Sequence, residues 1–193
     1  MDETTVLLAR HGRTGLNADG RLRGRLDPEL DEVGWGQARA LAQAAARYEP
    51  RLVVTSPLRR AVQTGQIVAE LGGLPTRTEP GFIDRDYGEL AGAPAAEVVA
   101  RWGSVDAAPG VERAAEVDRR AIRALDAVAA DAGGSTVVVV AHDAVNRLLL
   151  AALDPDAYPD PEAIPQPTGC FNILTRAVPA GPWRVREVGV VPR

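Results

Sequence analysis

Four consecutive valines, Val137–Val140, constrain the fold of this chain more than any other segment. Small residues bound them, and a short continuous run of β-branched residues is typical of a central strand buried on both faces. Further apolar runs at Thr5–Arg10 and Arg51–Thr55 alternate with segments of helical periodicity, of which Ala114–Ala132 is the longest. This alternation predicts a single α/β domain with a mostly parallel central sheet and helices on both faces.

Turn and capping signals place the other elements. Ser56 and Pro57 are predicted to be the N-cap and the first residue of a helix that ends near Leu71. The prolines of Asp154–Thr168 exclude a helix interior or a central strand, so we expect an ordered loop there. We also expect helices at Asp31–Arg47, Pro94–Trp102 and His142–Leu153, and closing strands at Phe171–Thr175 and Trp183–Val190.

The composition excludes several classes of protein. The 193 residues include 22 basic residues, all arginine, and 26 acidic ones, and a net charge of −4 argues against nucleic-acid binding. The absence of lysine excludes a Schiff base and a P-loop. A single cysteine, Cys170, excludes an internal disulfide, favours a cytoplasmic location and is expected to be a small buried residue. The apolar runs are too short to predict a membrane span, and the oligomeric state is left open.

The two histidines stand in the same local context. His11 directly follows the first predicted strand, and His142 directly follows the valine strand. The carboxyl ends of parallel strands line one edge of a sheet, where ligands bind, so we expect the two imidazoles to meet there. Two histidines without a clustered third ligand make a poor zinc site, so we expect no metal.

Arginines accompany these histidines. Arg10 precedes His11, while Arg59 and Arg60 lie in the first turns of the helix after the second strand. A helix N-terminus with arginine nearby favours an anion, and guanidinium groups match phosphate oxygens. Consecutive helical residues point about 100° apart, so one of Arg59 and Arg60 is expected on the surface. We predict an open, phosphate-sized pocket lined by imidazole and guanidinium groups.

Motifs along nearly the whole chain resemble those of the histidine phosphatase superfamily, the phosphoglycerate-mutase-like proteins. Leu8–Thr14 is similar to the Arg-His-Gly signature of that family, and Thr55–Thr64 to its second block. Phe82–Glu89 is similar to its acid-bearing block, and the valine strand leading into His142 to its last block. The resemblance implies one domain over residues 1–193, with a small cap-like insertion at about 85–113.

The resemblance also implies a role for individual residues. His11 is the expected nucleophile, which becomes phosphohistidine. The phosphoryl group is expected to be surrounded by Arg10, Arg60 and His142. Asp84 stands where the family has its proton donor. Attack by a neutral imidazole and proton transfer by a carboxylic acid require neither a metal nor a cofactor.

Two positions depart from the pattern of the family. Asp84 is shorter than the usual glutamate, so the nearby Asp86 and Glu89 stay open as the acid. Asp143 follows the second histidine, where the family usually has glycine. We expect Asp143 to cap the following helix and to point away from the pocket. The alternative is that Asp143 faces the pocket and binds a hydroxyl or an amine of the substrate.

The loop around Gly24 is expected to contact the substrate. Arg21, Arg23 and Arg25 alternate along it, so in an extended loop they point the same way, with Arg21 and Arg25 in solvent. The resemblance places Arg23 and Gly24 where the loop of the family approaches its substrate. We expect Arg23 to bind a second anionic group, a carboxylate or a phosphate, and Asn17 to lie near the scissile phosphate.

A short segment between Asp84 and His142 favours hydrolysis, because mutases of this family carry a longer insertion there that shields the phosphoenzyme from water. We therefore predict a metal-independent phosphomonoesterase that acts on a small phosphorylated metabolite. Mutase-type phosphoryl transfer and non-catalytic binding of a phosphate ester stay open as alternatives. The substrates considered are sugar phosphates, phosphoglycerates, phosphorylated cofactor precursors and biosynthetic intermediates.

Overall fold

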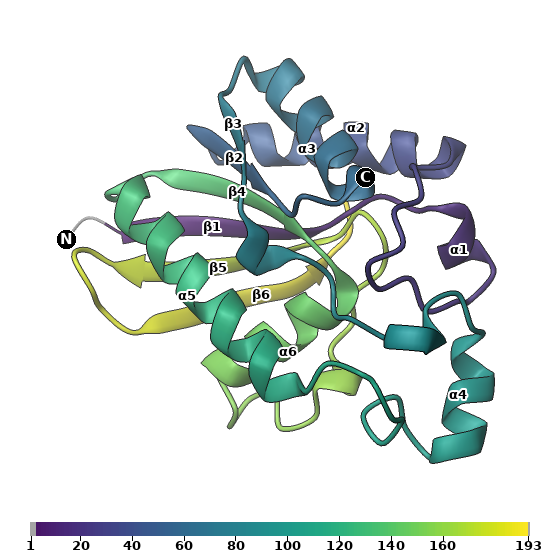
Figure 1. The fold of residues 1–193 in the computed structure, drawn as a ribbon. Coiled ribbons are helices and arrows are strands. Elements are labelled where there is room, and N and C mark those ends of the chain that lie inside the picture. The colour runs from purple at the N-terminus through teal and green to yellow at the C-terminus, as the bar shows by residue number, and fades with distance from the viewer. Residues whose placement is uncertain (1–2, 193) are drawn as a thin grey trace.

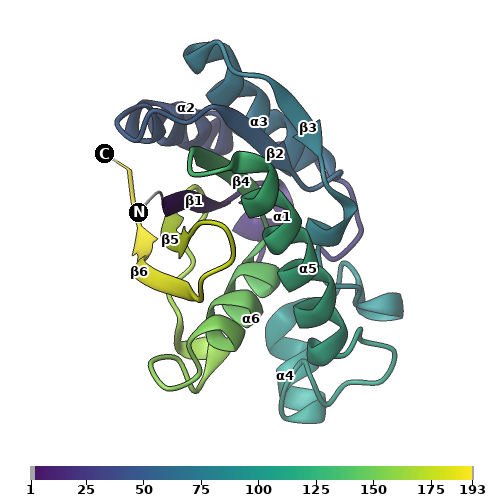
Figure 2. The same ribbon diagram turned by 90° about the vertical axis from the view of Figure 1, so that its left-hand side faces the viewer.

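The computed structural model, which describes residues 3–192, contains a six-stranded sheet with helices packed on both faces (Figures 1 and 2). The strand order is β3-β2-β4-β1-β5-β6. Strands β1 to β4 pair in parallel, whereas β5 is antiparallel to both of its neighbours, β1 and β6. The mostly parallel α/β fold predicted from the sequence is confirmed. The strands are β1 (Glu3–Arg10), β2 (Leu52–Thr55), β3 (Thr76–Thr78), β4 (Thr136–Ala141), β5 (Phe171–Ala177) and β6 (Trp183–Val190).

The helices divide between the two faces of the sheet and the edge beyond it. Figure 2 shows α2 and α3 on one face and α5 and α6 on the other. In Figure 1, α1 and α4 lie beyond the end of β1 that leads into His11. The helices are α1 (Gly15–Ala18), α2 (Glu32–Ala46), α3 (Arg59–Gly72), α4 (Ala95–Trp102), α5 (Ala114–Ala132) and α6 (Asp143–Leu153).

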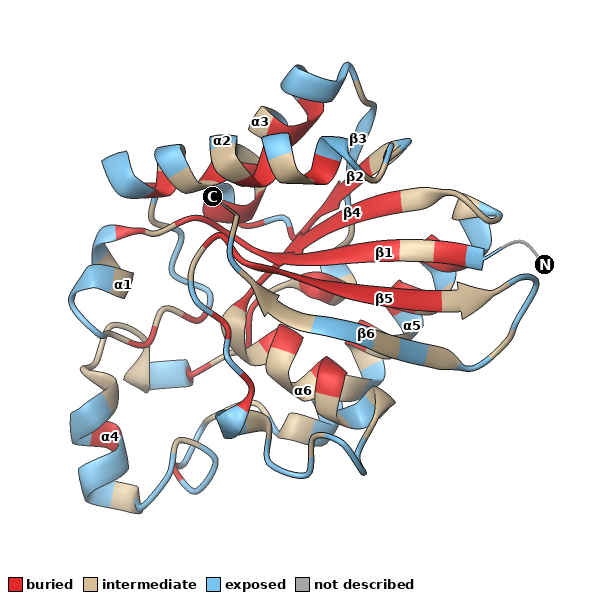
Figure 3. Ribbon diagram, turned by 180° about the vertical axis from the view of Figure 1, so that it is seen from behind, coloured by how far each residue is buried: buried red, intermediate tan, exposed pale blue. Residues whose placement is uncertain are grey.

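The valine strand β4 holds the two halves of the core together. It lies between β1 and β2, and its valines are completely or almost completely buried (Figure 3). Because side chains alternate along a strand, Val138 and Val140 pack with α2 and α3, while Val137 and Val139 pack with α5 and α6. Each fully buried valine contributes about 1.5–3 kcal/mol, so this strand fixes both helical layers to the sheet.

The segment predicted as a cap, residues 85–113, packs through a small apolar cluster of its own. Tyr87, Val98 and Ala108 bury their side chains there against Leu22 from the loop that follows α1. This cluster is separate from the two that cover the sheet. Within residues 3–192, no helix combines the length and the apolar character required to cross a bilayer.

Two details of secondary structure differ from the predictions. Helix α3 begins at Arg59 and Leu58 is its N-cap, so the prediction that Ser56 caps this helix was wrong. The Ser56 hydroxyl lies instead against a histidine of the site described below. Strand β3 was not predicted, because its three residues are exposed and show no apolar alternation.

Candidate active site

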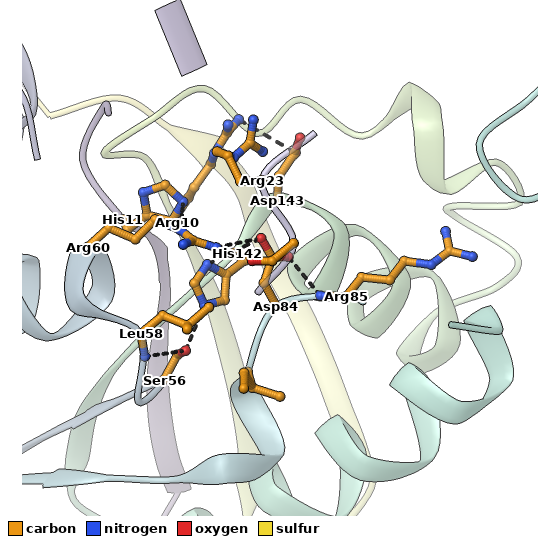
Figure 4. A network of polar contacts seen from close by, with 12 residues as sticks. Arg10, His11, Arg23, Ser56, Leu58, Arg60, Asp84, Arg85, His142 and Asp143 are labelled. Carbon is orange, nitrogen blue, oxygen red and sulfur yellow. Dashed lines mark hydrogen bonds and ion pairs between the residues drawn. The ribbon is translucent and has the colours of Figure 1, made fainter. Parts of the chain in front are cut away.

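The topology of the sheet brings the two histidines together. Strands β1 and β4 are adjacent and parallel, with Arg10 paired to Ala141 in the register. The residue that follows each strand is a histidine. His11 and His142 therefore lie side by side, with ring centroids 5.2 Å apart. Figure 4 shows them surrounded by charged side chains from several distant segments. The predicted meeting of the imidazoles at one edge of the sheet is therefore observed.

The contacts of His11 define its protonation state. Its Nδ1 lies 2.6 Å from the carbonyl oxygen of Gly12, and the Nε–H of Arg60 donates to its Nε2 across 3.2 Å. Nε2 is therefore the lone-pair nitrogen, and Nδ1 carries the proton and donates to Gly12. Burial, followed by the positive charge of Arg60, holds the pKa of His11 well below its usual range. The imidazole is neutral, with its lone pair on Nε2.

Two glycines fix the loop that carries His11. A Cβ on Gly12 would lie 2.4 Å from the carbonyl oxygen of Gly34, at the start of α2. The Gly12 N–H donates to Oγ1 of Thr64, which itself donates to the carbonyl oxygen of Arg60. The loop after β1 is thus tied to both α2 and α3, and a side chain at Gly12 would separate these elements.

Arg60 is the central cation of the cluster. It has no exposed surface, and its Nη2 donates to Oδ2 of Asp84 across 2.8 Å. The carbonyl oxygens of Gly24 and Leu26 accept its other N–H groups, at 2.9 and 2.7 Å. Arg59 instead points to solvent and pairs with Glu29. One arginine of the pair is on the surface, as the helical spacing predicts.

His142 is positioned by a residue whose role the sequence reasoning missed. Its Nε2 lies 2.7 Å from Oγ of Ser56, a hydroxyl that also accepts a hydrogen bond from the N–H of Leu58. The hydroxyl can therefore donate its own proton to Nε2, which leaves the imidazole proton on Nδ1. That Nδ1 lies 3.7 Å from Oδ2 of Asp84. Burial is also the main cause that lowers the pKa of His142 well below its usual range.

Three buried N–H groups at the centre of the site have no acceptor among residues 3–192. They are Nε of Arg10, Nε of Arg23 and Nδ1 of His142. Arg10 is otherwise held through Nη1, which donates to the carbonyl oxygen of Gln166. A buried donor without an acceptor costs about 1–3 kcal/mol, and such atoms are rare in folded proteins. Several such groups within one cluster favour an anion with several oxygen atoms.

Of the three candidate acids, the structure brings only Asp84 into the cluster. Asp84 is 1% exposed and contacts both Arg60 and His142. Asp86 accepts from the N–H of Gly88 and pairs with Arg25, and Glu89 is exposed. The shorter side chain of Asp84 is therefore compatible with a place beside the histidines.

Asn17 and Gly24, both predicted to lie near the substrate, differ in what they contact within the protein. Oδ1 of Asn17 accepts hydrogen bonds from the N–H and the hydroxyl of Thr14, which forms a capping box at the start of α1. Gly24 has a φ of 51°, and a Cβ there would meet the ring of Tyr87 at 3.0 Å. The assigned contact of Asn17 with phosphate stays a prediction, whereas Gly24 holds Arg60 through its carbonyl oxygen.

The loop is not extended, so the three arginines do not share one direction, and Arg25 is exposed as expected. The chain turns at Gly24, where the N–H of Leu26 donates to the carbonyl oxygen of Arg23. Arg21 donates to the carbonyl oxygen of Gly92, and Arg25 pairs with Asp86 in the cap segment. A positive φ at glycine reverses the chain, so only Arg23 lies in the cluster (Figure 4).

The prediction that Asp143 caps α6 was also wrong. His142 is the N-cap, and Asp143 is the first residue of the helix. Its Oδ1 accepts from Nε of Arg147 across 2.7 Å and lies 3.6 Å from Nη1 of Arg10. Two nearby guanidinium groups attract the carboxylate, which turns toward the site rather than away from it.

The site is more closed than the open pocket predicted from the sequence. His11 and His142 both have 0% exposed surface, because the charged side chains pack directly against the rings. Neither ring lines the cavity of about 290 Å³ whose wall includes Arg23 and Asp143. Among the described residues, no group of three or more histidine, cysteine or acidic side chains is arranged to hold a metal ion. Cys170 is buried as predicted, and burial raises the pKa of its thiol to about 12.

Comparison with known proteins identifies the family to which this chain belongs. Residues 6–189 match the model of the histidine phosphatase superfamily (branch 1). The chain belongs to the histidine phosphatase superfamily. It is similar to the phosphatase PhoE of Bacillus subtilis (strain 168), with 29% identity over 187 residues that cover 97% of this chain and 95% of that protein. It is also similar to the glucosyl-3-phosphoglycerate phosphatase of Mycobacterium tuberculosis, with 33% identity over 165 residues that cover 77% and 74% of the two chains.

Solved structures of the superfamily show the same fold. The mycobacterial glucosyl-3-phosphoglycerate phosphatase in complex with VO3 superposes with a TM-score of 0.82, and the alignment covers 98% of this chain and all of that one at 27% identity. The histidine phosphatase fold, the match over nearly the whole chain and the phosphatases among its relatives show that this protein is a phosphatase of that superfamily.

Proposed function

We propose that the protein hydrolyses phosphate monoesters of small metabolites through a phosphohistidine on His11, without a metal ion. The observation that carries this proposal is the unprotonated Nε2 of a buried, neutral imidazole surrounded by N–H groups that lack acceptors. Nucleophilic catalysis requires a lone pair at the attacking atom, and phosphoryl transfer requires donors for the equatorial oxygens. Both are present within one cluster.

The N–H donors of the cluster have a defined task in this reaction, which is to bind the oxygen atoms of the phosphoryl group. Arg10, Arg23 and His142 offer buried N–H groups, and Arg60 adds a guanidinium beside the nucleophile. For phosphorus to approach Nε2, the Nε–H of Arg60 has to turn from His11 to a phosphate oxygen. The exchange replaces a hydrogen bond to a neutral acceptor with one in which both partners are charged, as guanidinium–phosphate pairs are. Substrate binding itself therefore uncovers the nucleophile.

Asp84 completes the proton balance. When Arg60 turns to the phosphate, its ion pair with Asp84 is released, and the carboxyl group becomes available for proton transfer. Nε2 of His11 then bonds to phosphorus while the P–O bond of the ester breaks, and Asp84 gives its proton to the leaving oxygen. In the second step the Asp84 carboxylate takes a proton from water, whose oxygen displaces His11. Alcohol and inorganic phosphate are the products.

The deciding experiment detects the covalent intermediate. The protein is mixed with a 32P-labelled phosphomonoester, quenched in alkali, and half of the sample is then acidified. Label that survives alkali but is lost in acid, and that is absent from His11→Ala, is the expected result. Arg59→Gln is a matched surface control and should keep the label, because Arg59 points to solvent. EDTA should leave phosphate release unchanged.

Each alternative has its own signature in the same assay. A protein that only binds phosphate esters acquires no label and releases no phosphate. A mutase converts 3-phosphoglycerate efficiently into 2-phosphoglycerate, whereas the proposed phosphatase produces glycerate and inorganic phosphate. Label that is stable in acid would contradict a phosphohistidine.

A further inference from the structure

A cavity whose wall includes Arg23 and Asp143 is the place where the alcohol part of a substrate can lie. Its volume of about 290 Å³ is at the lower end of the range for ligand pockets, which suits a small group. Arg23 and Asp143 connect it to the phosphate site, since both also lie in the cluster of Figure 4. The charged and aromatic residues of its wall are Arg21, Arg23, Arg85, Tyr87, Asp143, Arg147 and Glu162.

Most of the charges in this wall are already satisfied inside the protein. The guanidinium of Arg85 points away from the histidines and pairs with Asp106 (Figure 4). Arg21 donates to the carbonyl oxygen of Gly92. Arg147 is held between Asp143 and the carbonyl oxygens of Pro161 and Glu162. The wall is therefore organised by protein contacts, and Asp143 is the acidic residue of this wall that pairs with Arg10.

The contacts of Asp143 leave one of its oxygens available. Both Arg147 and Arg10 approach Oδ1, and Oδ2 has no hydrogen bond from any described residue. The side chain is 28% exposed and lines the cavity. An ionised carboxylate accepts about two hydrogen bonds at each oxygen, so Oδ2 can accept from a ligand without losing either arginine.

The charge around Asp143 selects the kind of ligand group. An ammonium group at Oδ2 would lie close to two guanidinium groups, which already balance the carboxylate, and like charges at this distance repel. A hydroxyl carries no net charge, donates its proton to Oδ2 and accepts from a neighbouring guanidinium. A purely apolar group would leave Oδ2 desolvated without a donor, which is unfavourable.

We propose, on the basis of the phosphatase function above, that Asp143 and Arg147 form a recognition site for a hydroxyl of the leaving group. The protein then prefers phosphate monoesters of polyols or sugars over those of simple alcohols and amino alcohols. Arg10 and Arg147 balance the negative charge that Asp143 brings close to the phosphate. The carboxylate acts in specificity and is not the proton donor of the reaction.

The test compares three esters of equal chain length, namely glycerol 1-phosphate, n-propyl phosphate and 3-aminopropyl phosphate. For the native protein, kcat/KM should be at least about tenfold higher for glycerol 1-phosphate than for either of the others, since one hydrogen bond to a charged group accounts for roughly that factor. In Asp143→Ala the preference should fall to within about twofold. Asp143→Asn, which keeps an oxygen acceptor and the shape, should retain a reduced preference.

The quantity compared is the ratio of kcat/KM between two esters. A shift of Arg10 that lowers kcat/KM equally for all esters therefore leaves this ratio unchanged. Asp131→Ala removes an exposed carboxylate, paired with Arg77 on the surface, and serves as the matched control that keeps the native ratio.

Equal rates for the three esters, or an unchanged ratio in Asp143→Ala, would overturn the inference while phosphate release upholds the phosphatase. Preference for the aminopropyl ester would overturn it in favour of an amine. If no ester releases phosphate and His11 acquires no label, the phosphatase mechanism fails as well. If Asp143→Ala does not fold, the inference is tested by the kcat/KM ratios of Asp143→Asn and of the native protein.

Discussion

Nε of Arg60 donates a 3.2 Å hydrogen bond to Nε2 of His11, so the atom expected to attack phosphorus is covered by a group expected to bind phosphate. This single contact fixes the tautomer of His11 and keeps its lone pair toward the site. It also connects the nucleophile to Asp84, because Arg60 donates to that carboxylate through Nη2. The nucleophile, the cation and the proposed acid thus form one hydrogen-bonded chain.

Replacing Arg60 should affect both stability and catalysis. Arg60→Gln leaves the buried carboxylate of Asp84 without its cation, which is expected to cost about 3–5 kcal/mol of unfolding free energy. The rate should fall by about 10²–10³, as is usual when one donor to a developing charge is lost. Urea denaturation and steady-state kinetics measure the two effects. Arg59→Gln should change stability by less than about 1 kcal/mol, and Arg60→Gln/Asp84→Asn should recover part of the lost stability.

Asp84 should matter most for esters whose leaving group is a poor one. Asp84→Asn is expected to lower kcat for alkyl phosphates by about 10²–10⁴, because the leaving alkoxide then receives no proton. p-Nitrophenyl phosphate, whose leaving group needs little protonation, should be much less affected. Asp86→Asn and Glu89→Gln provide matched controls outside the cluster. A larger loss in either control would move the role of the acid away from Asp84.

Ser56 should orient His142. Ser56→Ala removes the hydroxyl 2.7 Å from Nε2, and the unsatisfied buried imidazole should cost about 1–3 kcal/mol of stability. The imidazole also loses the contact that places its proton on Nδ1, so kcat should fall while KM changes little. Ser56→Thr keeps a hydroxyl and should retain more of the rate than Ser56→Ala. Equal rates in native protein and Ser56→Ala would show that His142 is oriented by other contacts.

Arg23 should distinguish substrates with a second anionic group. Its buried Nε has no acceptor among the described residues, and it stands between the cluster and the cavity. Arg23→Ala should raise KM about tenfold or more for a phosphate ester that carries a carboxylate, and less for an uncharged alkyl ester. Equal effects on KM for both esters would restrict Arg23 to the scissile phosphate.

The two histidines should make stability depend on pH below about 6.5. Burial lowers the pKa of each below the reference value of 6.5, so the unfolded chain binds protons that the native protein does not. The unfolding free energy should therefore fall as the pH falls from 6.5 to 5.5, by at most about 1.4 kcal/mol per pH unit for each histidine. Urea denaturation at several pH values measures this slope. His142→Asn should reduce it by about half, and an unchanged slope would show that other groups cause it.

Local sequence was sufficient to predict the framework of the site. The valine run predicts a central strand because burial on both faces requires apolar side chains at every position, and β4 contains all four valines. The residue after a strand lies at the edge of the sheet, so each histidine is placed at an edge by its own strand. The different directions of Arg59 and Arg60 follow from helical geometry in the same way. These properties depend on neighbours in sequence.

Long-range contacts determined the remaining features. Ser56 and Asp143 both have side chains suited to cap a helix, but each instead contacts a residue from a distant segment, His142 for one and Arg10 for the other. Three acids lie within Phe82–Glu89, and only packing against Arg60 selects Asp84 among them. Capping tendencies amount to about 1 kcal/mol, whereas a buried polar group left without a partner costs about 1–3 kcal/mol and a buried charge costs more. Where the two conflict, the polar and charged groups brought together by the fold decide where a side chain points, and sequence patterns carry no record of those partners.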